Sequence, residues 1–144
     1  MDHVVYVDTQ ADELARLLDG SKRMILRGAA GRKLPHGRVN VGDRLYFINN
    51  NGEGAIKAVG SVTQVINSEK LSEAESVALV EQHQQALQLT DKQFKRWAGK
   101  RYLVLIEVGG VEAITPVDID KSSYANMDDW LPVGDIRSVY AEKA

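Results

Sequence analysis

The sequence predicts an α+β protein in which about six short β-strands form a small, closed or nearly closed β-barrel with flanking helices. Short apolar segments separated by Gly- and Asn-containing turns recur along the chain, and some pairs read as hairpins. Two capping boxes mark helices that fall between strands. No linker or low-complexity stretch divides the 144 residues, whose number suits one ordinary domain. We therefore expect residues 1–144 to form a single domain.

In the N-terminal half, strands are expected at Val4–Val7, Arg23–Arg27, Arg44–Asn49 and Ala55–Ile66. The last two form one hairpin around an Asn- and Gly-rich turn. Gly60 lies near the middle of the returning strand, which indicates a bulge or a close approach of another segment. A helix with Asp8-Thr9 as its N-cap is expected to stop at Gly20.

In the C-terminal half, the two capping boxes begin at Ser72 and Thr90. They predict a helical insertion between strands over Ser72–Ala98. Leu89 and Phe94 have the spacing of a hydrophobic staple around the second cap. Further strands are expected at Arg101–Val108, Val111–Val117 and Ile136–Tyr140, with Gly109-Gly110 as a hairpin turn between the first two.

The composition excludes several classes of protein. There are no cysteines, so disulfides, thiol nucleophiles and thiolate metal sites are excluded. No apolar run approaches the roughly 18 residues of a membrane span, and the N-terminus lacks the pattern of a secretory signal. The three histidines are scattered without ligand spacing. We expect a cytoplasmic protein with no metal, no cofactor and no membrane partner.

One segment, residues 22–44, carries most of the positive charge. It holds seven basic residues and one acid, Asp43, a charge of +6 in a chain whose total is -2. Its middle, Gly28 to Arg38, has three glycines and a proline but no apolar run. Such a loop can bring backbone N–H groups and cationic side chains close to an anionic partner. Alternatively, the charges simply keep a mobile loop solvated.

A second basic cluster and an acidic segment follow. The cluster consists of Lys92, Lys95, Arg96, Lys100 and Arg101, which could follow phosphates or form a solvated helix face. Residues 107–135 hold seven acids and one base, and could cover another side of the molecule or pair with the basic segment. The acidic stretch Asp118–Asp129 leaves open a third class of function, that of a protein-interaction domain.

The residues Gly31-Arg32-Lys33-Leu34-Pro35-His36-Gly37-Arg38 resemble the G-x-K-x-x-E-x-R signature of ASCH domains, with His36 at the position of the family's Glu. ASCH domains belong to the PUA-like superfamily of small β-barrels, which is related to EVE-type domains. The resemblance implies binding of RNA or of a modified nucleobase or nucleotide in a basic cleft beside the Gly28–Arg38 loop. It also implies an alternative, a hydrolase that removes an acyl group from a modified nucleoside through Lys33.

In the hydrolase alternative, Lys33 would be base or nucleophile and His36 would replace the Glu as the proton acceptor. Thr63 and Thr115 lie on expected strands, and nothing in the sequence places either beside Lys33. For the binding function, the expected ligand contacts are Arg27, Arg32, Lys33, Arg38, Asn49, Asn50, Lys57, Arg96, Lys100 and Trp130.

Aromatic residues provide possible stacking surfaces for a base. The candidates are Trp97, Tyr102, Tyr124 and Trp130. Trp97 has helical spacing from Phe94, which favours a place in the core. Trp130 follows two aspartates in an irregular segment and is the better candidate for a cleft wall.

Overall fold

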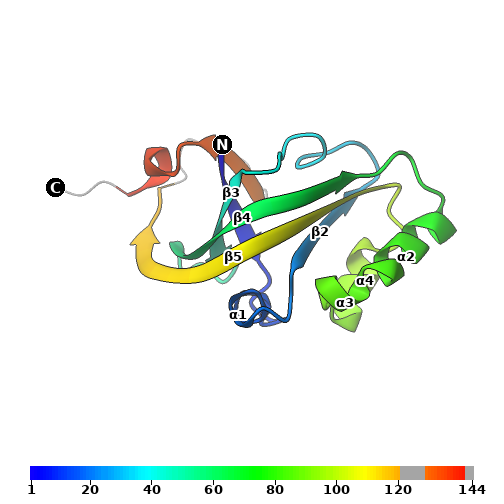
Figure 1. The fold of residues 1–144 in the computed structure, drawn as a ribbon, viewed down its shortest axis with the longest axis horizontal. Helices are drawn as coiled ribbons and strands as arrows, with labels where there is room; N and C mark the ends of the chain where they lie inside the picture. Colours follow the sequence, from blue (N-terminus) through cyan, green and yellow to red (C-terminus); the bar gives the residue numbers. More distant parts are fainter. Residues whose placement is uncertain (121–128, 142–144) are drawn as a thin grey trace.

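The computed structural model describes residues 1–120 and 129–141, and it contains one six-stranded sheet curled into a half-barrel (Figure 1). The strand order is β2-β5-β4-β3-β1-β6. The strands are β1 (Asp2–Val7), β2 (Met24–Ala29), β3 (Arg44–Asn49), β4 (Ala55–Asn67), β5 (Tyr102–Asp118) and β6 (Trp130–Gly134). The expected α+β architecture of about six strands with flanking helices is confirmed.

The strand pairing is antiparallel except between β1 and β3, which run parallel. The expected hairpin over Arg44–Ile66 is present as β3 and β4. At Gly60, an added Cβ atom would lie 2.8 Å from Val111 Cγ2 on the neighbouring strand, so only glycine fits without a shift. The close approach predicted at this residue is therefore confirmed.

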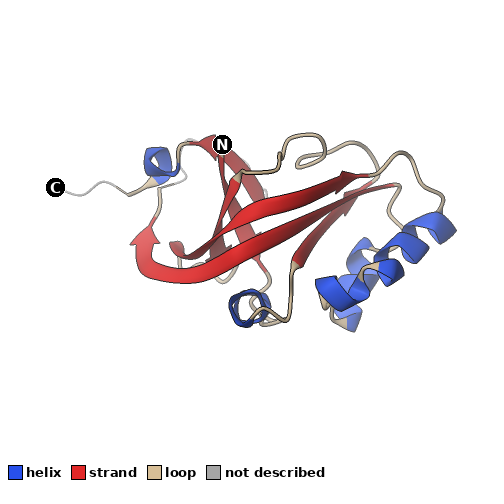
Figure 2. Cartoon of the chain, viewed as in Figure 1, coloured by secondary structure: helices blue, strands red, loops and turns tan. Residues whose placement is uncertain are grey.

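The helices lie at the two ends of the sheet and, in the view of Figure 2, below it. They are α1 (Glu13–Asp19), α2 (Glu73–Gln82), α3 (Gln84–Leu87), α4 (Asp91–Trp97) and the 3₁₀ helix η1 (Ile136–Val139). Both capping boxes are formed, at Ser72 with Glu75 and at Thr90 with Gln93. The helices α2 to α4 lie together at one end of the long β4–β5 ribbon (Figure 1). They come between β4 and β5 in the sequence, which agrees with the helical insertion predicted over Ser72–Ala98.

Two expected β elements are different in the structure. Gly109-Gly110 is not a hairpin turn, because β5 runs on through it and residues 112–118 pair with the first half of β4. Ile136–Tyr140 is not a strand, because the Asp135 side chain accepts a hydrogen bond from the Arg137 N–H and starts η1. The last strand, β6, precedes it and, among the described residues, pairs with β1 alone, so the missing N–H of Pro132 is tolerated at a sheet edge.

The first helix also begins later than expected. It starts at Glu13, because the Asp8 carboxylate accepts a hydrogen bond from the Ala11 N–H at 3.2 Å and holds residues 8–11 in a turn. It ends at Gly20, which has a φ of 84° and is the expected helix stop. Among the described residues, no helix is long and apolar enough to cross a membrane.

The described residues form three core clusters, of which one lies inside the curl of the sheet and another under the insertion. The inner cluster includes Val5, Ile25, Phe47 and Ile106 from four different strands, together with Trp130 at the start of β6. The second cluster packs the α2–α4 helices on the outer side of β2 and β5. This packing fixes the C-terminal end of α4 next to the end of β2, where the cleft described below is found.

Candidate nucleotide-binding cleft

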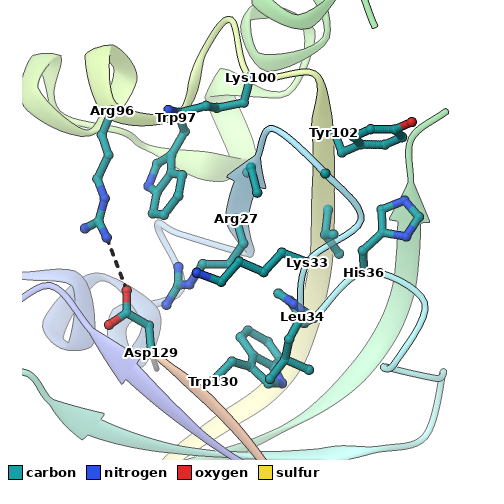
Figure 3. A pocket seen from close by; sticks show the side chains of 15 residues that line it. Arg27, Lys33, Leu34, His36, Arg96, Trp97, Lys100, Tyr102, Asp129 and Trp130 are labelled. Atoms are coloured by element: carbon teal, nitrogen blue, oxygen red, sulfur yellow. Dashed lines mark hydrogen bonds and ion pairs between the residues drawn. The ribbon is translucent and has the colours of Figure 1, made fainter. Parts of the chain in front are cut away.

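A cleft of about 410 Å³ opens between the end of β2, the loop that follows it, the end of α4 and the starts of β5 and β6 (Figure 3). Its charged side chains are Arg27, Lys33, Arg96, Lys100 and Asp129. Four are cationic and one is anionic, which gives a net charge of +3 with His36 neutral. Its aromatic side chains are Trp97, Tyr102 and Trp130. The cleft thus combines positive charge with aromatic rings in the volume of one small ligand.

Arg27 lies at the floor of the cleft, between the two tryptophans. Its guanidinium carbon is 5.8 Å from the ring centroid of Trp97 and 5.8 Å from that of Trp130, within the range of cation–π interactions. Its Nη1 and Nη2 donate hydrogen bonds to the carbonyl oxygens of Leu26 and Tyr6, at 2.9 and 2.7 Å. These contacts fix the guanidinium plane and link β2 to β1.

The guanidinium of Arg27 is poorly compensated for a buried cation. Arg27 is only 9% exposed, and its Nε is buried without a hydrogen-bond partner. Among the described residues, no carboxylate lies within ion-pair distance of it. Burial lowers the pKa of Arg27, although the more distant charge of Glu13 acts in the opposite direction. Arginine nevertheless stays charged at neutral pH.

An ion pair joins the two sides of the cleft. Arg96 Nη2 at the end of α4 lies 3.3 Å from Asp129 Oδ2, just before β6 (Figure 3). The Arg96 guanidinium also covers the Trp97 ring, with its carbon 4.2 Å from the centroid. Because both charges are largely exposed, the pair is weak and can exchange partners when a charged ligand enters.

The opposite end of the cleft is formed by the loop and the start of β5. His36 Nε2 is hydrogen-bonded to the Ser68 carbonyl oxygen at 2.9 Å, and its ring meets Tyr102 edge-on at a centroid distance of 5.8 Å. An added Cβ on Gly28 would lie 3.2 Å from Lys100 Cβ and 2.9 Å from Leu103 Cδ2. Glycine at this position therefore lets the Lys100 stem lie close against the end of β2.

A buried hydrogen-bond chain holds Trp130 in place. Its indole N–H donates to His3 Nδ1 at 3.0 Å. Since an indole only donates, His3 carries its proton on Nε2, which lies 2.8 Å from Asp43 Oδ2. Burial raises the pKa of Asp43, but hydrogen bonds from the Asn40 N–H and from His3 outweigh it, and the net shift is downward.

Half of the side chains predicted to bind the ligand meet at this cleft. Arg27, Lys33, Arg96, Lys100 and Trp130 line it, as does His36. Asn50 lines a small adjoining hollow that shares Arg27, Arg96, Trp97 and Asp129 with the cleft.

The other predicted contacts lie outside the cleft lining. Arg32 lies over the Tyr102 ring at 5.5 Å and near Glu69, and Arg38 is exposed. Asn49 and Lys57 interact with Glu53 at the β3–β4 hairpin. Thr63 and Thr115 do not line the cleft, and Thr63 donates to Glu107. Tyr124 lies outside the described residues.

The sequence named Trp97 as a possible stacking residue but favoured a place in the core, and it indicated no role for Asp129 in a cleft. Trp97 packs partly on the core, as its helical spacing suggested, but its ring also lines the cleft. Asp129 has no signal in the sequence beyond its place in the acidic segment. The basic segment 22–44 is less exposed than its charge suggests, because Lys22 is buried against Glu13 and Asp43 is buried against His3. Among the described residues, no cluster of His, Asp and Glu is suited to a metal ion.

Comparison with known proteins finds similar structures but no similar sequences. No family model and no curated protein sequence matches the chain. The solved structure of the ASCH protein from Zymomonas mobilis superposes with a TM-score of 0.67 at 12% sequence identity, over 98% of this chain and 96% of that one. A tyrosine-to-phenylalanine variant of the same protein gives 0.68 at 12% identity, over 97% and 99%. This chain therefore has the same fold as the ASCH protein from Zymomonas mobilis.

Proposed function

We propose that this protein binds RNA or a nucleotide-like ligand in the cleft beside the Gly28–Arg38 loop. The observation that carries the proposal is the convergence of four cationic side chains and two half-buried aromatic rings on one cavity. Cations hold phosphates, and aromatic faces hold bases whatever their sequence. The ASCH-type fold supports the same class of ligand.

Each group has a separate role in this proposal. Lys33 and Lys100 project from the loop and from the end of the helical insertion, and supply mobile positive charge. Trp97 and Tyr102 offer ring faces or edges for stacking. Arg27 is held by two hydrogen bonds to backbone carbonyl oxygens, so its guanidinium cannot move along an RNA strand. It contributes a fixed positive charge at the floor of the cleft.

Binding of fluorescently labelled single-stranded RNA tests the proposal. The measurement is the dissociation constant by anisotropy over a series of salt concentrations. We expect affinity to fall with salt, with a slope of log K against log salt of about -0.7 for each phosphate contacted. Lys33→Ala and Lys100→Ala should each weaken binding and reduce that slope by about 0.7.

Lys70→Ala is the matched control, because Lys70 is exposed and lies outside the cleft lining. It should change neither the affinity nor the slope. Equal losses in all three lysine variants would indicate nonspecific attraction to the whole surface and would contradict the proposal.

A further inference from the structure

We propose that the cleft recognises a terminal phosphate monoester, either that of a free nucleotide or that at the end of an RNA strand. The inference rests on the proposed function and makes it more specific. It starts from Arg27, a cation that is 9% exposed, has an unpartnered Nε and lacks a carboxylate at ion-pair distance among the described residues. A buried guanidinium of this kind is stabilised by an anion that enters the cleft.

The balance of charge favours a monoester over a diester. The cleft carries a net charge of +3 in the volume of about one nucleotide. An internal phosphodiester brings one negative charge per nucleotide, whereas a phosphate monoester brings about 1.5 to 2 at neutral pH and three acceptor oxygens. The monoester therefore compensates more of the positive charge within the same space.

The surroundings of Arg27 explain how such a group would be held. The rings of Trp97 and Trp130 both lie within cation–π distance of the guanidinium, which leaves less room for a base beside it. Arg27 lines the cavity, and Nη1 and Nη2 each keep one N–H beyond the bonds to Leu26 and Tyr6. A compact anion such as phosphate fits donors at the edge of a guanidinium. Lys33 and Lys100 border the same cavity and can approach the remaining oxygens.

The experiment compares ligands that differ only at the phosphate. Calorimetry measures binding of adenosine, of adenosine 5′-monophosphate, and of its methyl diester, which adds only a methyl group and loses about one negative charge. Anisotropy measures one short single-stranded RNA with a 5′-phosphate, with a 3′-phosphate, or with hydroxyl groups at both ends. We expect a monoester ligand to bind at least about tenfold more tightly than its diester or hydroxyl counterpart.

The preference for the monoester should depend on residues of the cleft. Arg27→Gln should abolish it, and circular dichroism shows whether this buried variant is folded. Lys100→Gln, at an exposed position, should reduce the preference without a risk to folding, whereas Lys70→Gln should leave it intact.

The outcomes separate this inference from the proposed function. Tight binding of the mononucleotide identifies a free nucleotide as the source of the phosphate, and preference for a phosphorylated RNA end identifies the strand terminus. Either result supports the inference. Equal affinities for phosphorylated and hydroxyl RNA would overturn it and leave RNA binding intact, whereas no binding of any nucleotide or RNA would overturn both.

Discussion

At the scale of single residues, the cleft depends on His3 and Asp43, two side chains that do not line it. Trp130 is only 2% exposed, and its orientation is set by His3 and Asp43 behind it. Each donor in this chain of hydrogen bonds has an acceptor, and the Asp43 carboxylate also accepts a hydrogen bond from the Asn40 N–H at 2.9 Å. Removing one member leaves a buried polar group without a partner, which costs more than the lost hydrogen bond.

Asp43→Ala should therefore lower the free energy of unfolding by about 1–3 kcal/mol at neutral pH. Because the pKa of Asp43 is lowered in the folded protein, its contribution is present above the unfolded pKa of about 4 and is lost as the pH falls through the folded value. The difference from the wild type in urea unfolding should shrink below about pH 4. Glu69→Ala, at a fully solvated carboxylate, is the control and should change little. If Asp43→Ala lowered the free energy of unfolding as little as Glu69→Ala, the hydrogen bonds from Trp130 through His3 to Asp43 would not stabilise the fold, and this prediction would be wrong.

At the scale of elements, local signals predicted the helices well and the strand ends less well. The two capping boxes are formed as expected because each depends on residues three apart. The Gly109-Gly110 dipeptide has the composition of a turn, yet β5 continues through it because β4 is long enough to pair with both of its halves. Strand partners lie far apart in sequence, so no local pattern decides between a turn and a bulge.

The contact of Gly60 with Val111 gives a prediction at this scale. Gly60→Ala should lower the free energy of unfolding by about 1–3 kcal/mol, because the new methyl group meets the stiff Val111 side chain in the β4–β5 ribbon. Gly31→Ala is the matched control, since a methyl group there meets nothing within 4 Å and its φ is not positive. In a double-mutant cycle, Val111→Ala should restore part of the loss. Additive effects of the two substitutions would exclude this steric explanation.

At the scale of the whole molecule, the sequence predicted the fold and about half of the cleft. The Gly31–Arg38 motif indicated the loop, and the basic residues of β2 and α4 were expected to act in binding. That they meet at one cavity depends on the packing of α4 beside β2 and on the curl that brings β6 to the same place. The pairing of Arg96 with Asp129, 33 residues apart, and the support of Trp130 by His3, 127 residues away, have no local signature.

The central claim, that the ligand occupies this cleft, is tested most directly by tryptophan fluorescence. The chain has two tryptophans, and both line the cleft. Titration with unlabelled RNA or nucleotide should change the emission of the wild type with the same dissociation constant as the anisotropy measurement. Most of that change should be lost in Trp97→Phe, because Trp97 is the more exposed of the two rings. Binding with unchanged emission, and with full affinity in Lys33→Ala and Lys100→Ala, would place the ligand elsewhere and contradict the account.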